Sequence, residues 1–163
     1  MQFYLRQGTD PDALFSVMEP SGQLVYRVKG DSLSIGGKFY LLDSAGKEAA
    51  RIFSVGVTAI SKYAIQVGDK ERARVTWNFN AKREQVKIKG VHWRFRGDLA
   101  ARSYDILDID SSVVMTHGRC WNKIGDCYAV QVTNESDALL CLCLAVILDS
   151  TVIGGTAAPV PAG

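Results

Sequence analysis

The sequence predicts a mainly β domain, a closed antiparallel barrel of about a dozen strands around a central hydrophobic C-terminal helix. Two observations lead to this fold class. A hairpin pattern repeats along the chain, and one uninterrupted apolar run, residues 138–148, lies near its end. With 163 residues, of which 47% are hydrophobic and 22% are charged, the chain can bury a core without disulfides or metals.

The repeated pattern has an aromatic start, a short alternating run and a turn built from Gly, Asp or Ser. Clear copies begin at Phe15, Tyr40 and Tyr63, and a second run follows each turn. Looser copies begin near residues 86, 104 and 128, so the starts lie 18 to 25 residues apart. This spacing is typical of consecutive β-hairpins.

Each predicted strand has one apolar face. Tyr63, Ile65 and Val67 share a face, and so do Ala73, Val75, Trp77 and Phe79 on the next run. Side chains alternate between the two faces of a strand, so each strand buries one side. About a dozen such strands in series must close or stack, because large open sheets curl or split.

The apolar run at 138–148 predicts a helix from about Ser136 to Ser150, with Ser136 or Asn134 as its N-cap. A transmembrane helix needs about 20 residues, so no transmembrane span is expected. A helix that is apolar on every side must be surrounded, and the barrel lumen is the simplest container. The expected division is a barrel domain over residues 1–154 and a loose tail over 155–163.

The hairpins, the phrase at 25–30 (Val-Tyr-Arg-Val-Lys-Gly), residues 40–52 and the apolar helix resemble the LURP-one-related family. That family belongs to the tubby C-terminal-like superfamily, with tubby domains and phospholipid scramblases. The resemblance covers about residues 1–154 and implies a twelve-stranded antiparallel barrel around a central helix. It also implies phospholipid binding through basic residues on the barrel wall, as in tubby domains. Scramblase activity is not expected, because the chain lacks the scramblase calcium loop and a cysteine run for palmitoylation.

Basic residues concentrate in one part of the chain. The net charge is only +2, so nucleic acid is not an expected partner. Residues 81–96, however, contain six basic residues and a single acidic residue, Glu84, which gives this segment a local charge of +5. The predicted sites for an anionic membrane lipid are Arg72, Arg74, Lys87, Lys89, Arg94 and Arg96. The alternative interpretation is a solvated face that discourages edge aggregation.

The four cysteines predict no metal site. Cys141 and Cys143 are two residues apart on the predicted helix, roughly 200° around its axis, so they cannot share a metal ion. Cys120 and Cys127 lack a zinc spacing, but they can approach one another if they flank a turn. A reducing compartment such as the cytoplasm would keep the cysteines as thiols.

We expect no enzyme activity and no cofactor, because neither His92 nor His117 accompanies a nucleophile motif. The N-terminus lacks the pattern of a signal peptide, so the expected location is the cytoplasm, at the periphery of a membrane. The expected function is a non-enzymatic binding module for anionic phospholipid. The alternative is a protein-interaction or structural scaffold without a lipid role.

Overall fold

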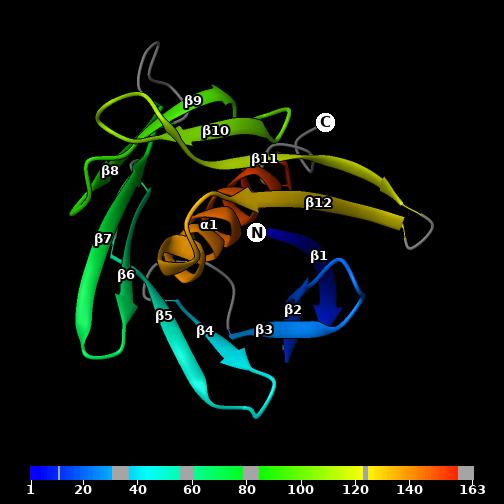
Figure 1. Cartoon of the computed structure of the whole chain (residues 1–163). Coiled ribbons are helices and arrows are strands. Elements are labelled where there is room, and N and C mark those ends of the chain that lie inside the picture. Colours follow the sequence, from blue (N-terminus) through cyan, green and yellow to red (C-terminus); the bar gives the residue numbers. More distant parts are fainter. Residues whose placement is uncertain (11, 31–36, 56–60, 79–84, 123–124, 158–163) are drawn as a thin grey trace.

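In the described part of the chain, twelve strands form one sheet that wraps around a helix (Figure 1). The computed structural model describes residues 1–157, apart from 11, 31–36, 56–60, 79–84 and 123–124. The strands are β1 (Gln2–Asp10), β2 (Ala13–Met18), β3 (Leu24–Gly30), β4 (Lys38–Asp43), β5 (Glu48–Ser54), β6 (Ser61–Val67), β7 (Lys70–Trp77), β8 (Val86–Lys89), β9 (Arg94–Asp98), β10 (Ser103–Leu107), β11 (Val113–Asn122) and β12 (Gly125–Val132). A 3₁₀ turn, η1 (Glu135–Asp137), leads into helix α1 (Ala138–Ala157).

The sheet is an antiparallel meander in the order β8-β7-β6-β5-β4-β3-β2-β1-β12-β11-β10-β9. The first strand pairs with the last, with Gln2 opposite Gln131 and Leu5 opposite Tyr128. Strands β8 and β9 are the two ends of the sheet and face each other across a seam. No ladder joins them among the described residues, so the barrel is nearly closed. The predicted antiparallel barrel of about twelve strands is thus confirmed.

Turns alternate between the two ends of the barrel because consecutive strands run antiparallel. One end, which we call the entry rim, carries the turns at 19–23, 44–47, 68–69, 90–93 and 108–112. The start of β1 and the end of β12 lie at the same end. The chain enters the lumen from this rim, through residues 133–137.

Helix α1 lies in the middle of the barrel, as predicted (Figure 1). Residues 140–148 are each no more than 5% exposed, and they form one core with the inward faces of the strands. Tyr63, Ile65, Ala73 and Val75 are buried, as their alternation predicts. None of the described helices has the length and apolarity needed to cross a bilayer.

The start and the end of the helix differ from the prediction. A 3₁₀ turn comes first, and the side chain of Asn134 makes no capping hydrogen bond. The helix continues past Ser150 to Ala157, and so through the predicted start of the tail. The polar residue at the predicted end, Asp149, is buried against a partner in the barrel wall, so it does not terminate the helix. Residues 158–163 of the predicted tail lie outside the described residues.

Candidate functional site

Four of the six predicted cations lie on two neighbouring strands that are hydrogen-bonded to each other. Arg72 and Arg74 belong to β7, and Lys87 and Lys89 belong to β8. The half-buried Ile88 and the buried Val86 point the other way, toward the core, as predicted. We call the outer surface of β6, β7 and β8 the basic wall.

The strand register places the cations of the basic wall in rows. Arg74 is directly opposite Lys89, and Thr76 is directly opposite Lys87. Neighbouring strands lie about 4.8 Å apart, so the register holds the Arg74 and Lys89 cations close together. Like charges directly opposite one another repel, and a bound anion would relieve the repulsion.

The other two predicted cations, Arg94 and Arg96, lie on β9 at the far end of the sheet. They are therefore across the seam from β8 and do not continue the ladder of the basic wall. Arg94 donates a hydrogen bond to the Ser111 hydroxyl, and Arg96 forms an ion pair with Asp105 at 2.7 Å. The sequence pattern did not indicate this break, because β8 and β9 follow one another along the chain.

Acidic side chains hold some of the six predicted cations. Besides Arg96, Arg74 is bound by Glu71, 2.9 Å away, and this contact lowers the pKa of the Glu71 carboxyl. The basic wall is therefore less positive than the sequence predicts.

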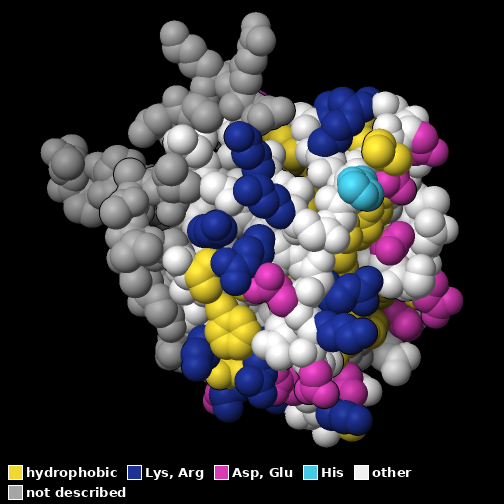
Figure 2. Space-filling view, turned by 90° about the vertical axis from the view of Figure 1, so that its left-hand side faces the viewer, with side chains coloured by type: hydrophobic (Ala, Val, Ile, Leu, Met, Phe, Trp, Pro, Cys, Tyr) yellow, Lys and Arg dark blue, Asp and Glu magenta, His cyan; other side chains and the backbone are white. Residues whose placement is uncertain are grey.

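One cation of the basic wall escaped the sequence analysis. Lys62 on β6 is directly opposite Thr76, which places it in one row with Lys87. Its signal was present in the sequence, since Lys62 precedes the inward-facing Tyr63 and so must face outward. Figure 2 shows this side of the barrel, where Lys and Arg side chains gather with hydrophobic side chains between them.

A second cluster of polar groups lies inside the barrel and is unrelated to the wall. His117 on β11 and Asp149 on α1 have side chains that are 0% and 1% exposed. The His117 Nε2 is 3.1 Å from the Asp149 carboxylate, and its Nδ1 is 2.7 Å from the Arg102 carbonyl. The imidazole ring stacks between Tyr104, at 4.5 Å between centroids, and Tyr128, at 5.1 Å.

The hydrogen bonds restrict the protons of this pair. The Arg102 carbonyl only accepts, so Nδ1 of His117 carries a proton. The contact between Nε2 and Asp149 needs a second proton, held by the ring or by the carboxyl group. In both forms the His117–Asp149 pair is neutral overall, as burial requires.

Burial and the nearby Asp149 carboxylate raise the pKa of Tyr104 well above its ordinary value. Its hydroxyl is enclosed and has no hydrogen-bond partner among the described residues. The pair connects helix α1 to strand β11 of the barrel. Solvent does not reach His117 and Asp149, so a substrate could not reach them either. The sequence analysis missed it because its two members are 32 residues apart.

Comparison with known proteins establishes the family. The model of the LURP-one-related family matches residues 1–149. The chain belongs to the LURP-one-related family. It is 28% identical over 135 residues to the uncharacterized protein YxjI of Bacillus subtilis strain 168, covering 83% of each chain. A crystal structure of an Arabidopsis thaliana protein superposes with a TM-score of 0.60 at 15% identity, covering 92% of this chain and 90% of that one.

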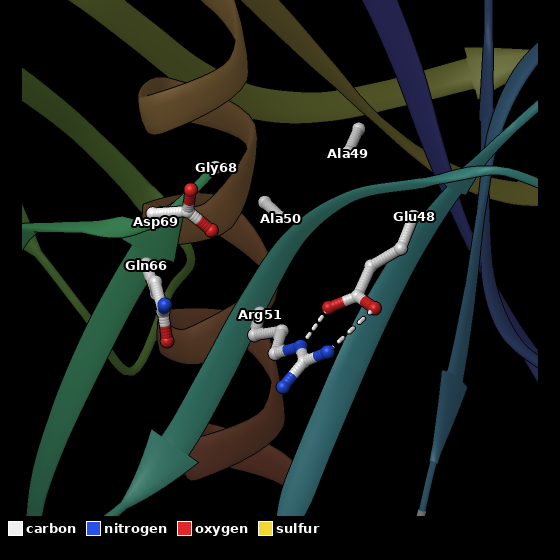
Figure 3. Close-up of a pocket in the computed structure, with 7 residues that line it drawn as sticks. All are labelled: Glu48, Ala49, Ala50, Arg51, Gln66, Gly68 and Asp69. Atoms are coloured by element: carbon white, nitrogen blue, oxygen red, sulfur yellow. Dashed lines mark hydrogen bonds and ion pairs between the residues drawn. The ribbon is translucent and has the colours of Figure 1, made fainter.

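A shallow depression of about 270 Å³ opens in this LURP-one-related domain between β5 and the β6–β7 turn (Figure 3). Its lining includes Glu48, Arg51, Gln66 and Asp69. The Arg51 guanidinium is held by the Glu48 carboxylate, with Nη2 donating to Oε2 at 3.0 Å. Ligand pockets are mostly apolar and deep, so this polar depression is a weak candidate for one.

The cysteines of this LURP-one-related domain are free thiols. Cys141 and Cys143 are buried in the core, and burial raises the pKa of Cys141 to about 12 and that of Cys143 further. Cys120 and Cys127 are directly opposite one another on β11 and β12, a closer approach than the sequence alone indicated. Within the described ranges, no group of three or more His, Cys, Asp or Glu side chains is placed to hold a metal ion.

Proposed function

We propose that this LURP-one-related domain is a non-enzymatic binding module that docks on an anionic phospholipid surface through the basic wall. The observation that carries the proposal is the register of β6, β7 and β8. It aligns Lys62 with Lys87 in one row and Arg74 with Lys89 in the next. An array of cations on a flat strand surface matches the phosphates of a membrane better than it matches one small ligand.

The apolar side chains beside the wall support a membrane over a free phosphate. Continuing the row of Arg74 and Ala64 across the sheet leads to Phe53 on β5 and then Lys38 on β4. The Lys38 ammonium lies 5.6 Å from the centre of the Phe53 ring. Phe53 is half-buried, so part of its ring remains open to an interface where aromatic side chains are favoured.

The strength of such docking is limited. Each Lys or Arg near an anionic leaflet contributes about 1 kcal/mol, and stable anchoring usually needs a second signal. Since Arg74 and Arg96 already have acidic partners, the proposed binding is weak and reversible. Such binding would place the protein in the cytoplasm, at the periphery of a membrane.

Vesicle sedimentation tests the proposal. The protein should sediment with vesicles of phosphatidylcholine and phosphatidylglycerol, less so as NaCl is raised, and not with phosphatidylcholine alone. Arg72→Glu/Lys89→Glu should weaken this binding by about thirtyfold or more, from the loss of two cations at about 1 kcal/mol each. The matched control is Arg6→Glu/Arg27→Glu, the same charge change on exposed positions of β1 and β3. Equal loss in both variants, or no sedimentation of the wild type, would refute the basic wall and leave the protein-interaction scaffold as the function to test.

A further inference from the structure

Exposed apolar side chains concentrate at one end of the barrel. Among the described residues, the large hydrophobic side chains classed as exposed are Met1 at 51%, Leu24 at 43%, Val55 at 38%, Ile109 at 77% and Val113 at 38%. All except Val55 lie at the entry rim. Leu24 begins β3, Met1 precedes β1, Ile109 lies in the β10–β11 turn and Val113 begins β11. In the order of the sheet these positions follow one another around one half of the rim, with the end of β12 between β1 and β11.

The β10–β11 turn holds Ile109 outward on a well-braced backbone. The Asp108 carboxylate accepts from the Ile109 N–H, and the Asp110 carboxylate accepts from both the N–H and the hydroxyl of Ser112. Backbone hydrogen bonds from Asp108 to Ser112 and from Ser111 to Asp108 close the turn. A turn whose backbone is already ordered loses less conformational entropy on binding than a loose one.

Acidic groups surround these apolar side chains. Segments 19–24, 107–114 and 132–140 contain five acidic residues and no Lys or Arg. Two cationic groups reach these segments from outside, the Arg94 guanidinium at the Ser111 hydroxyl and the Met1 ammonium at the Val132 carbonyl, so the acids still outnumber the cations. The acids are Glu19, Asp108, Asp110, Glu135 and Asp137. The second and third segments are in direct contact, because the Thr133 hydroxyl donates to the Val113 carbonyl at 2.7 Å. The hydrogen bonds from Ser112 lower the pKa of Asp110, which keeps this carboxylate charged.

We propose that these three segments, the acidic rim, form a docking surface for a partner protein. The partner would contribute a segment in which a large apolar side chain lies between Lys or Arg residues. Its apolar side chain would cover Ile109 and Val113, and its cations would meet the carboxylates around them. Complementary charge fixes the register and speeds association, while the buried apolar contact supplies most of the affinity.

The charge of the acidic rim argues for this partner over a membrane. An anionic leaflet would be repelled by the five carboxylates, which outnumber the Arg94 and Met1 cations beside them, whereas it would be attracted by the basic wall. The two surfaces have opposite charge and differ in position, so this proposal does not depend on lipid docking.

Selection from a random-peptide display library on the folded domain tests the proposal. The selected peptides should combine Lys or Arg with a large apolar residue. Ile109→Ser should weaken their binding by about tenfold or more, from the loss of one buried aliphatic side chain. Asp110→Asn, which retains an acceptor for Ser112, should weaken it severalfold and reduce its salt dependence. Val55→Ser, at the other end of the barrel, is the matched control and should change nothing.

Several results would overturn the proposal. Selected peptides without basic residues, or peptides that bind Ile109→Ser as tightly as the wild type, would remove the acidic rim as their site. A loss of vesicle sedimentation in Ile109→Ser would assign the rim to lipid instead. Self-association of the wild type that Ile109→Ser abolishes would assign it to a second copy of this chain. Thermal unfolding of Ile109→Ser and Val55→Ser should match the wild type, since both side chains are exposed.

Discussion

The buried pair of His117 and Asp149 allows a prediction in which two substitutions at one contact have very different costs. Replacing His117 by Ala leaves the Asp149 carboxylate, 1% exposed, without its partner in the core. Removing one partner of a buried pair costs about 3–5 kcal/mol when the group left behind is charged. The ring stacked between Tyr104 and Tyr128 is lost as well, which adds about 0.5–1.5 kcal/mol for each aromatic contact.

Replacing Asp149 by Asn should cost much less. The Asn amide can donate to Nε2 of a neutral His117, while Nδ1–H still donates to the Arg102 carbonyl. Every hydrogen bond of the pair is then retained without a charge, so we expect a loss of about 1 kcal/mol or less. The two variants should therefore differ by at least about 2 kcal/mol, the gap between a stranded buried charge and a satisfied neutral pair.

Urea denaturation followed by tryptophan fluorescence measures both free energies of unfolding. Asp105→Asn is the control, because it breaks the exposed ion pair with Arg96 and should change stability by about 0–1 kcal/mol. Nitrogen NMR should report one Nδ1-protonated tautomer of His117 in the Asn variant. If Asp149→Asn unfolds as readily as His117→Ala, the stability depends on the charge itself, and the hydrogen-bond argument is wrong.

Two further predictions concern the core thiols and a close approach between the paired strands β9 and β10. The pKa of Cys141 is raised to about 12 in the fold and that of Cys143 is raised further, so unfolding releases their protons as the pH rises above about 9. Stability should then fall by up to about 1.4 kcal/mol per pH unit for each group, and less steeply in Cys141→Ala/Cys143→Ala; equal pH profiles would contradict the shift. Gly97 has φ +137°, and a Cβ there would lie 2.6 Å from the Ser103 carbonyl oxygen, whereas Gly22 at φ +88° has open space around it. Gly97→Ala should therefore lower the unfolding midpoint more than Gly22→Ala, which carries only the backbone cost of about 1–2 kcal/mol, and equal midpoints would show that β9 and β10 can move apart.

Several elements of the fold could be predicted because their signals are local. The aromatic starts at Phe15, Tyr40 and Tyr63 lie in β2, β4 and β6, and the turns after them join hairpins. The run at 138–148 is apolar on all sides, and the lumen of a barrel is the simplest place in this chain to bury such a helix. Family resemblance added the strand number, which the structure confirms.

The candidate sites could be predicted from local sequence signals only in part. The six cations could be identified from alternation, but alternation says which face a side chain lies on and not which residue is opposite. The register therefore decided that Lys62 joins the basic wall and that Arg94 and Arg96 lie across the seam.

The sequence alone determines that this protein is a barrel of β-hairpins filled by its own C-terminal helix. The period of two in the strands and the unbroken apolar run are properties of short segments, and short segments are what a sequence displays. Tertiary structure alone decided which charges lie side by side on the basic wall, which acids surround Ile109 and that Asp149 meets His117. Apart from Asp108 and Asp110, which flank Ile109 in the sequence, these groups are far apart in the chain, and the closure of the barrel brings them together.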